Sequence, residues 1–397
     1  MTVHSKLGDV VENADIDRDE PQPEIHIEER RLKLLDFCKT AIKVDGSDIH
    51  LQAGSVPMIR VHGRARFLDC PALTDEDMKE YVGQIMDSQQ DPGEKKSILE
   101  HKGSVDVAYG MPNKEARFRT SVFHSRERLA VVMRRIVTKI PNFNDLALPP
   151  QVEKLADFHR GIVIVSGTTG SGKSTTLAAI IGQINRTWSE RIITVEDPVE
   201  FQHENAKSLV SQVEVGTDSE SYEHALRAMM RQDPDTILVG EIRDTFSLST
   251  ALRAADTGHL VFTTVHATNA PMTIERMVSL FDPLQKELQQ TQLGLNLNAV
   301  ICQRLAKKRD GKGRVPVVEI MMATPIVRKY ILDGEFEKLK GAVGNRESGS
   351  QSFDQHLTEL FTKQIIDVNE AKRLASNVDA LKLALRGIGN SDTRLTR

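Results

Sequence analysis

A glycine-rich run that ends with a lysine, GTTGSGKST, occupies residues 167–175, with the spacing G-x-x-x-x-G-K-S. Glycine loses more conformational entropy on ordering than any other residue, so a purely structural turn would favour other residues. A phosphate site explains the composition, because glycines let successive backbone N–H groups face one anion at the positive end of a helix. The Lys173 amine would reach the β- and γ-phosphates, and the Ser174 hydroxyl would bind Mg²⁺. The residues expected to hold the nucleotide are Gly167, Thr168, Thr169, Gly170, Ser171, Gly172, Lys173, Ser174 and Thr175.

The residues on both sides of this loop have the pattern that a phosphate loop requires. The apolar, β-branched run IVIV at 162–165 is typical of a buried strand, and LAAII at 177–181 is typical of a helix. A glycine-rich turn that matched by chance would not need a strand before it and a helix after it. The order of strand, loop and helix therefore favours phosphate binding.

Four apolar runs, IVIVS, RIITV, TILVG and HLVFTTV, alternate with helical stretches in the second part of the chain. Strands that are apolar throughout are buried on both faces, which indicates an α/β fold with a mostly parallel sheet and helices on each side. Ligands bind beyond the carboxyl ends of the strands in such sheets. The polar residues that follow each run are therefore candidates for chemistry.

Two glutamates follow these runs, Glu241 after TILVG and Glu196 after RIITV. A carboxylate near the γ-phosphate could orient or deprotonate the attacking water, or hold Mg²⁺ through water, and Glu241 is the first candidate. Many phosphate-loop ATPases carry an aspartate just before this glutamate, whereas this chain has Gly240, so Ser174 and water would contribute more to Mg²⁺ binding. The structural alternatives are a surface-loop glutamate at 241 and a turn at Glu196 and Asp197.

Histidines and arginines supply further candidates for the same reaction. His259 and His266 flank the fourth apolar run, where an imidazole could sense the γ-phosphate by hydrogen bonding; the alternative is a capping or packing histidine. The stretch ARFRTSVFHSRERLAVVMRRI is dense in arginine, and phosphoryl transfer needs cations beyond the loop lysine. Arg119, Arg126 and Arg134 are the candidates, with a solvated basic strand face as the alternative.

Composition and patterning divide the chain into segments. Before the linker, a helical period is followed by alternating strands, SDIHLQ, MIRVHGRARFL, SVDVAYG and ARFRTSVFH, which predicts a small α+β domain with an antiparallel sheet. The linker IPNFNDLALPP is rich in turn formers. The expected segments are an acidic disordered tail at 1–29, the first domain at 30–139, the linker at 140–150, the phosphate-loop domain at 151–388 and a loose tail at 389–397.

The overall composition is that of an ordinary globular protein, with 39% hydrophobic residues and a formal net charge of -4. This charge gives no sign of a surface for nucleic acid. No apolar run approaches the length of a membrane span, and the N-terminus lacks the pattern of a signal peptide, so we expect no direct membrane insertion. Cys38, Cys70 and Cys302 are scattered and odd in number, which fits a reducing cytoplasm rather than a disulfide framework or a zinc site.

The chain resembles the type IV pilus retraction ATPases of the PilT/PilU type, within the secretion-ATPase superfamily. The resemblance runs from about residue 30 to 390 and includes the phosphate loop. The first domain contributes SDIHLQAGSVPMIRVHG. The second contributes ITVEDPVEF, which is similar to the family's acidic box, ILVGEIRD, which is similar to its divergent Walker B motif, and TGHLVFTTVHATNA, which is similar to its histidine box.

The resemblance implies a PAS-like N-terminal domain joined to a RecA-like ATPase domain, in a homohexameric ring with ATP and Mg²⁺ held between subunits. It also implies that Glu241 acts in hydrolysis, that Glu196 lies on the Mg²⁺ and water side, and that His259 and His266 belong to the histidine box. The arginines match the family's inter-domain nucleotide contacts at Arg119, Arg126 and Arg134, with Arg128 not excluded.

Two departures from related families narrow the expected function to an ATP-hydrolysing motor for pilus retraction. The four-cysteine zinc motif of assembly ATPases is missing, which favours retraction. The retraction signature AIRNLIRE is replaced by PIVRKYILD at 325–333, which favours the accessory PilU type. The alternatives are an accessory ring that couples to a primary retraction ATPase, or another secretion or conjugation ATPase; a small-molecule kinase is less well supported.

The resemblance also implies the surroundings of the protein. The expected partners are an inner-membrane pilus platform protein and a related retraction ATPase. The expected location is the cytoplasm, at the inner membrane only through the pilus machine. The linker at 140–150 would be the hinge on which one domain moves.

Overall fold

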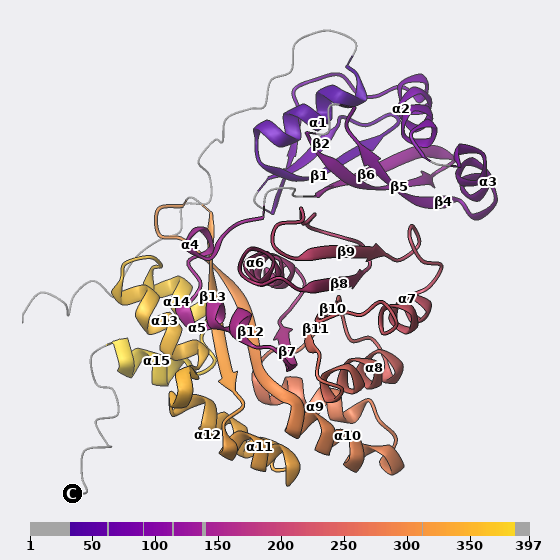
Figure 1. Ribbon diagram of the computed structural model, residues 1–397. Helices are drawn as coiled ribbons and strands as arrows, with labels where there is room; N and C mark the ends of the chain where they lie inside the picture. Colours follow the sequence, from indigo (N-terminus) through magenta and orange to yellow (C-terminus); the bar gives the residue numbers. More distant parts are fainter. Residues whose placement is uncertain are drawn as a thin grey trace, which may run out of the picture. The chain divides into compact units, whose positions relative to one another are not determined.

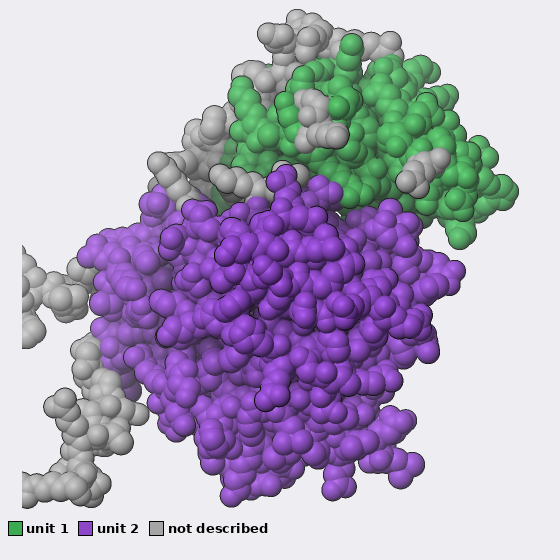
Figure 2. All heavy atoms as spheres, viewed as in Figure 1, with its two compact units in different colours: residues 1–135 green, residues 136–397 purple. Residues whose placement is uncertain are grey.

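The structure is a computed structural model that describes residues 32–61, 63–89, 91–112, 115–136, 140–311 and 313–385. The chain divides into two compact units, residues 1–135 and residues 136–397 (Figure 2). The tails predicted at 1–29 and 389–397 lie outside the described residues. Each unit has its own hydrophobic core and is described by itself below.

The first unit is built on a six-stranded sheet with the strand order β3-β2-β1-β6-β5-β4. Its strands are β1 (Gly46–Gln52), β2 (Met58–Val61), β3 (Arg64–Phe67), β4 (Ser104–Gly110), β5 (Arg117–Ser125) and β6 (Arg128–Ile136). Its helices are α1 (Leu34–Lys43), α2 (Asp75–Asp87) and α3 (Pro92–Lys102) (Figure 1). Alternate strand residues such as Ile49 and Met133 pack with Phe37 of α1 and Met78 of α2 in one core, which is why the strands alternate in hydropathy.

The α+β prediction for this part of the chain is confirmed, and the paired strands β1 with β2, β1 with β6, and β4 with β5 are antiparallel. The run MIRVHGRARFL forms two strands rather than one. Gly63 adopts a φ of 81°, a turn conformation that favours glycine, and β2 then pairs with β3. Helix α2 begins at a capping box in which Thr74 and Asp77 satisfy each other's backbone N–H groups.

The second unit is built on a seven-stranded sheet with the order β13-β12-β7-β11-β10-β8-β9. Its strands are β7 (Gly161–Ser166), β8 (Arg191–Glu196), β9 (Leu209–Glu214), β10 (Thr236–Val239), β11 (Leu260–Val265), β12 (Leu297–Lys307) and β13 (Arg314–Met322). Neighbouring strands from β12 to β9 are parallel, and β13 pairs antiparallel with β12. The four predicted runs are the contiguous strands β7, β11, β10 and β8, which confirms the mostly parallel α/β sheet.

Helices cover both faces of this sheet (Figure 1). They are α4 (Phe143–Leu146), α5 (Pro150–Glu153), α6 (Lys173–Thr187), α7 (Tyr222–Met229), α8 (Thr245–Asp256), α9 (Ala270–Ser279), α10 (Pro283–Asn296), α11 (Pro325–Leu332), α12 (Leu339–Gly344), α13 (Phe353–Thr362), α14 (Val368–Leu374) and α15 (Val378–Leu385). Within β7, Ile162 and Ile164 pack in the core that contains α8, whereas Val163 and Val165 pack in the core that contains α6. Successive side chains point to opposite faces, so a strand buried on both faces must be apolar throughout.

The segment at 140–150, expected as a linker, contains ordered structure of its own. Asn142 caps helix α4 by accepting a hydrogen bond from the Asp145 N–H. Phe143 is buried and packs in the same core as Leu155 and Ile180. From Asn142 onward the segment is therefore part of the second unit. Among the described residues, no helix is long and apolar enough to cross a membrane.

Candidate functional site

The phosphate loop connects β7 to α6, and its three glycines all have positive φ angles, 148° at Gly167, 77° at Gly170 and 91° at Gly172. A Cβ at Gly167 would lie 2.6 Å from the Gln303 carbonyl oxygen, and one at Gly172 would lie 2.7 Å from Gln303 Nε2. A Cβ at Gly170 would have no atom within 4 Å. The loop therefore presses against β12 on one side and is open at Gly170, as a cradle for a ligand requires.

The Lys173 amine lies at this loop and donates hydrogen bonds to the carbonyl oxygens of Gly167, at 3.0 Å, and Thr168, at 3.2 Å. Burial lowers the pKa of Lys173, while the nearby carboxylates of Glu200 and Glu241 act to raise it. An anion placed in the cradle would favour the charged amine in the same way.

A buried hydroxyl in the same loop points to a polar ligand. The Ser171 Oγ atom is buried and has no hydrogen-bond partner among the described residues. An unpaired buried hydroxyl costs free energy, so such groups usually have a partner in the bound state. The phosphate-loop residues thus fit the phosphates of a nucleotide, and their role in binding one stays a prediction.

Gln303 on β12 is a site residue that the sequence analysis missed. Its buried side chain accepts a hydrogen bond of 2.8 Å from Thr176 Oγ1, in the first turn of α6. Together with its contacts to Gly167 and Gly172, this bond holds the loop and helix in register with β12. A polar residue inside the apolar run AVICQRLA was the available signal.

Glu241, after β10, and His266, after β11, lie at the same edge of the sheet as the phosphate loop. The His266 Nε2 atom is 3.6 Å from Glu241 Oε2. The other oxygen, Glu241 Oε1, accepts a hydrogen bond from Arg243 Nε, and Arg243 Nη1 lies 3.0 Å from Asp197 Oδ2 after β8. Three strand ends are thus joined through side chains, because parallel strands place their carboxyl ends together.

The glycine at position 240 has a steric reason. A Cβ at Gly240 would lie 3.0 Å from the Val195 carbonyl oxygen and 3.3 Å from the Glu196 Cα atom. The ends of β8 and β10 approach so closely that an aspartate there would require its neighbours to shift by a few tenths of an ångström. The missing Walker B aspartate is therefore coupled to the packing of these two strands.

Glu196 at the end of β8 is partly buried and is held by its neighbours. Its Oε1 atom accepts hydrogen bonds of 2.6 Å from Thr194 Oγ1 and 3.2 Å from Gln212 Nε2. Burial raises the pKa of Glu196, and these hydrogen bonds oppose the effect. A carboxylate in such a setting is suited to take up a proton.

The structure does not bring His259 to the phosphate loop within one chain. His259 precedes β11, and its carbonyl oxygen accepts a hydrogen bond from the Gly161 N–H, at the first residue of β7. Its Nδ1 atom lies 2.9 Å from the Ala254 carbonyl oxygen, at the end of α8. This is the geometry of a helix-capping histidine, and a role for His259 in catalysis stays a prediction.

The three candidate arginines belong to the first unit, on β5, on β6 and in the turn between these two strands. Arg119 is exposed on β5, and Arg126 is exposed in the turn before β6 with a φ of 52°. Arg134 on β6 is paired through Nε with Asp48 Oδ1 at 2.8 Å. Arg128, also considered, lies 3.5 Å from an Asp75 carboxylate oxygen. Their nucleotide contacts therefore stay a prediction.

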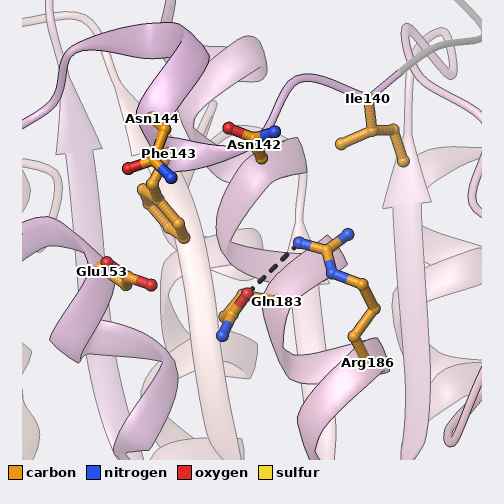
Figure 3. Close-up of a pocket in the computed structure, with 7 residues that line it drawn as sticks. All are labelled: Ile140, Asn142, Phe143, Asn144, Glu153, Gln183 and Arg186. Carbon is orange, nitrogen blue, oxygen red and sulfur yellow. Dashed lines mark hydrogen bonds between the residues drawn. The ribbon is translucent and has the colours of Figure 1, made fainter.

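A pocket of about 460 Å³ lies away from the phosphate loop, between the segment that contains α4 and the far end of α6 (Figure 3). Its walls include Ile140, Phe143 and Arg186, and Arg186 donates to Gln183 Oε1 at 3.3 Å. Gln183 lies ten positions after Lys173 along α6, which is about 15 Å at the helical rise. The pocket is therefore not the phosphate site.

Comparison with known proteins identifies the family to which this chain is similar. The profile described as "Type II/IV secretion system protein" matches residues 33–373. A "Twitching motility protein" of Neisseria gonorrhoeae is 40% identical over 82% of this chain and 86% of its own length. The Pseudomonas aeruginosa proteins named type IV pilus ATPase PilU and type IV pilus retractation ATPase PilT are 37% and 39% identical, over 90% and 87% of this chain and 92% and 98% of their own lengths.

Solved structures agree with this placement. The crystal structure titled as the pilus retraction motor PilT with bound ADP superposes with a TM-score of 0.80 and 38% identity, over 89% of this chain and 99% of that one. The fold is therefore the RecA-like fold of secretion ATPases, and the family and the ADP-bound neighbour support nucleotide binding by this chain. With its phosphate loop, acidic strand ends and histidine at one sheet edge, the chain is an ATPase that belongs to the Type II/IV secretion system protein family.

Proposed function

We propose that this chain is a hexameric, ATP-hydrolysing motor that drives type IV pilus retraction. The observation that carries the proposal is the convergence of Lys173, Glu241 and His266 at one sheet edge, in a chain that resembles retraction ATPases over most of its length. These groups can bind a triphosphate, position a water and respond to loss of the γ-phosphate. One relative is named a type IV pilus retractation ATPase, and another is named for twitching motility.

The nucleotide is ATP, bound with Mg²⁺. The phosphate-loop residues fit the phosphates, as the open cradle at Gly170 and the unpaired Ser171 hydroxyl indicate. The described residues contain no cluster of three histidine, cysteine or acidic groups that could hold a metal alone. Mg²⁺ would therefore depend on Ser174, phosphate oxygens and water, with Glu241 acting through water; the ion would neutralise charge on the phosphates.

Each catalytic group then has one task. The loop N–H groups and Lys173 hold the phosphates, Glu241 orients the attacking water, and Glu196 is a second candidate to take up its proton. His266 contacts Glu241 on one side and would donate to the γ-phosphate on the other, so it reports loss of that phosphate. Lys173 and Glu241 both act before the bond breaks, whereas His266 links the reaction to motion.

The motor form is a homohexamer in which arginines of the first unit reach a nucleotide. Arg119, Arg126 and Arg134 are the candidates, and exposed positions at Arg119 and Arg126 leave them accessible. The segment from Asn142 packs on the second unit, so we place the pivot of the expected hinge before that residue. The ring would act at the inner membrane on a pilus platform protein, alongside a related retraction ATPase.

The test is ATP hydrolysis by the purified chain at a concentration where sizing shows a hexamer, with Glu241→Gln as the blank. Activity well above the blank supports a motor. An Arg119→Ala ring that assembles and keeps full activity would remove that arginine from the nucleotide site.

The second candidate function is an accessory ring that couples to a primary retraction ATPase. The observation that favours it is the PIVRKYILD segment, which forms helix α11 in place of the retraction signature. Its Arg328 binds the carbonyl oxygens of Gly294 and Leu295 on α10, so this arginine is engaged within the chain. If the protein alone restores retraction in cells that lack the primary ATPase, the accessory role is wrong.

A further inference from the structure

Arg243 links the acidic ends of two strands in the second unit. Its Nε atom donates to Glu241 Oε1, and its Nη1 atom donates to Asp197 Oδ2 at 3.0 Å. Glu241 and Asp197 follow different strands and lie 44 positions apart in the chain. A planar guanidinium can serve two carboxylates at once, which an ammonium cannot do with the same fixed geometry.

The ring of Tyr222 lies against the Arg243 guanidinium. The guanidinium carbon of Arg243 lies 5.2 Å from the ring centroid of Tyr222, within the range of a cation–π contact. The Tyr222 hydroxyl donates to the Glu241 carbonyl oxygen at 2.8 Å and accepts from the Glu241 N–H at 3.1 Å. Tyr222 thus fixes the backbone of Glu241 while Arg243 fixes one carboxylate oxygen.

We propose that Arg243 is the positioning residue that orients the Glu241 carboxylate for the attacking water. With Oε1 held by Arg243, Oε2 is directed to the side of His266, 3.6 Å away. A glutamate held by one contact alone could rotate about its side-chain bonds, and misplacement by about 1 Å can cost about 100-fold in rate. The inference rests on the proposed role of Glu241 in hydrolysis.

Arg243 keeps the positive charge with which it bridges the Glu241 and Asp197 carboxylates; we call this bridge the clamp. Partial burial acts to lower the pKa of Arg243, but hydrogen bonds to Glu241 and Asp197 raise it. The backbone of Arg243 is also held, since its N–H donates to Ser247 Oγ at 3.2 Å in the first turn of α8. The clamp is therefore built from α7, α8 and the ends of β8 and β10.

The experiment compares Arg243→Gln and Arg243→Lys in the full chain, measuring kcat, the KM for ATP and ADP binding by calorimetry. We expect Arg243→Gln to lower kcat about 100-fold, with KM and ADP affinity within about threefold of the native values. Arg243→Lys should recover part of the rate, because an ammonium can contact Glu241 but cannot bridge to Asp197.

A double-mutant cycle tests the bridge itself. Asp197→Asn should lower kcat less than Arg243→Gln does, and adding it to Arg243→Gln should cause no further loss. The matched control is Arg227→Gln, since Arg227 pairs with Glu223 at 2.6 Å and lies 4.9 Å from the Phe246 ring centroid, outside the site. Arg227→Gln should leave kcat unchanged.

Three results would overturn the inference. A native kcat in Arg243→Gln would show that Glu241 needs no clamp, and a raised kcat would show that Arg243 restrains Glu241. A loss of ADP affinity equal to the loss in kcat would show that Arg243 binds nucleotide. Glu241→Gln separates this failure from that of the proposed function: if it too hydrolyses ATP at the native rate, the role of Glu241 itself is wrong.

Discussion

The two edges of the seven-stranded sheet differ in what they can do, although the same strands form both. At the carboxyl edge lie the phosphate loop, Glu196, Glu241 and His266. His266 lies 3.6 Å from Glu241, and the Glu241 carboxylate acts to raise the pKa of Lys173 in the loop. At the amino edge, His259 contacts a helix end. The reason is topological: parallel strands collect the loops that follow them at one edge, where ligands bind.

His259 and His266 belong to one sequence motif but lie at opposite edges of the sheet. They are seven positions apart and both belong to TGHLVFTTVHATNA, but β11 runs between them. At about 3.3 Å per residue, the strand separates them by about 20 Å. Membership of a motif therefore does not by itself place a side chain at the site.

Lys173→Ala should have the largest effect at the carboxyl edge. We expect ATP affinity to fall about 100-fold and turnover to be lost, because charge-assisted contacts to the phosphates disappear. Calorimetric titration with ATP measures this. Lys207→Ala is the control, since the exposed Lys207 amine contacts the Thr187 carbonyl oxygen. Tight ATP binding by the Lys173→Ala variant would contradict the assignment of the phosphate loop as the ATP-binding site.

Glu241→Gln should separate chemistry from binding at the same edge. We expect kcat to fall about 1000-fold while ATP affinity stays native, because the amide keeps the shape but cannot accept a proton or orient water as a carboxylate does. Single-turnover hydrolysis measures the chemical step. Weakened binding with a native chemical rate would instead make Glu241 a nucleotide-holding residue.

Substituting His266 or His259 tests directly whether catalysis depends on the carboxyl edge of the sheet alone. His266→Asn should lower kcat about tenfold, the scale of one hydrogen bond in the site. His259→Asn should leave kcat within about twofold and lower the free energy of unfolding by about 1 kcal/mol, through loss of the contact at the end of α8. Equal losses of kcat in both variants would bring His259 into catalysis, for example through another subunit.

Gly240→Ala should have the smallest effect and acts on strand packing. We expect a loss of about 1 kcal/mol in the free energy of unfolding, because the new Cβ would meet the Val195 carbonyl oxygen at 3.0 Å. Gly83→Ala on α2 is the control, since a Cβ there meets nothing within 4 Å and helix propensity should add stability. Denaturant unfolding measures both, and a neutral Gly240→Ala would remove the steric account of the missing aspartate.

The sequence predicted much of the second unit because each signal there is local. The phosphate loop has a fixed spacing, and helix α6 (Lys173–Thr187) contains the predicted helical run at 177–181. The four buried strands show as apolar runs. By contrast, β12 brings Gln303 against the loop although Gln303 lies 127 positions after Thr176, and α7 brings Tyr222 to Glu241. A polar residue in an apolar run marks Gln303 as unusual, but no local pattern identifies the partner in either contact.

The sequence by itself determined the phosphate loop, the fold class and the family, since short spacings encode local backbone geometry and strand burial encodes sheet type. Only the tertiary structure decided which candidates meet. It placed His266 beside Glu241 and His259 at the opposite edge of the sheet. It also joined Glu241 to Asp197 through Arg243 and brought the ends of β8 and β10 close together at Gly240. Strand direction and strand order fix these contacts, and both arise from packing between segments far apart in the chain.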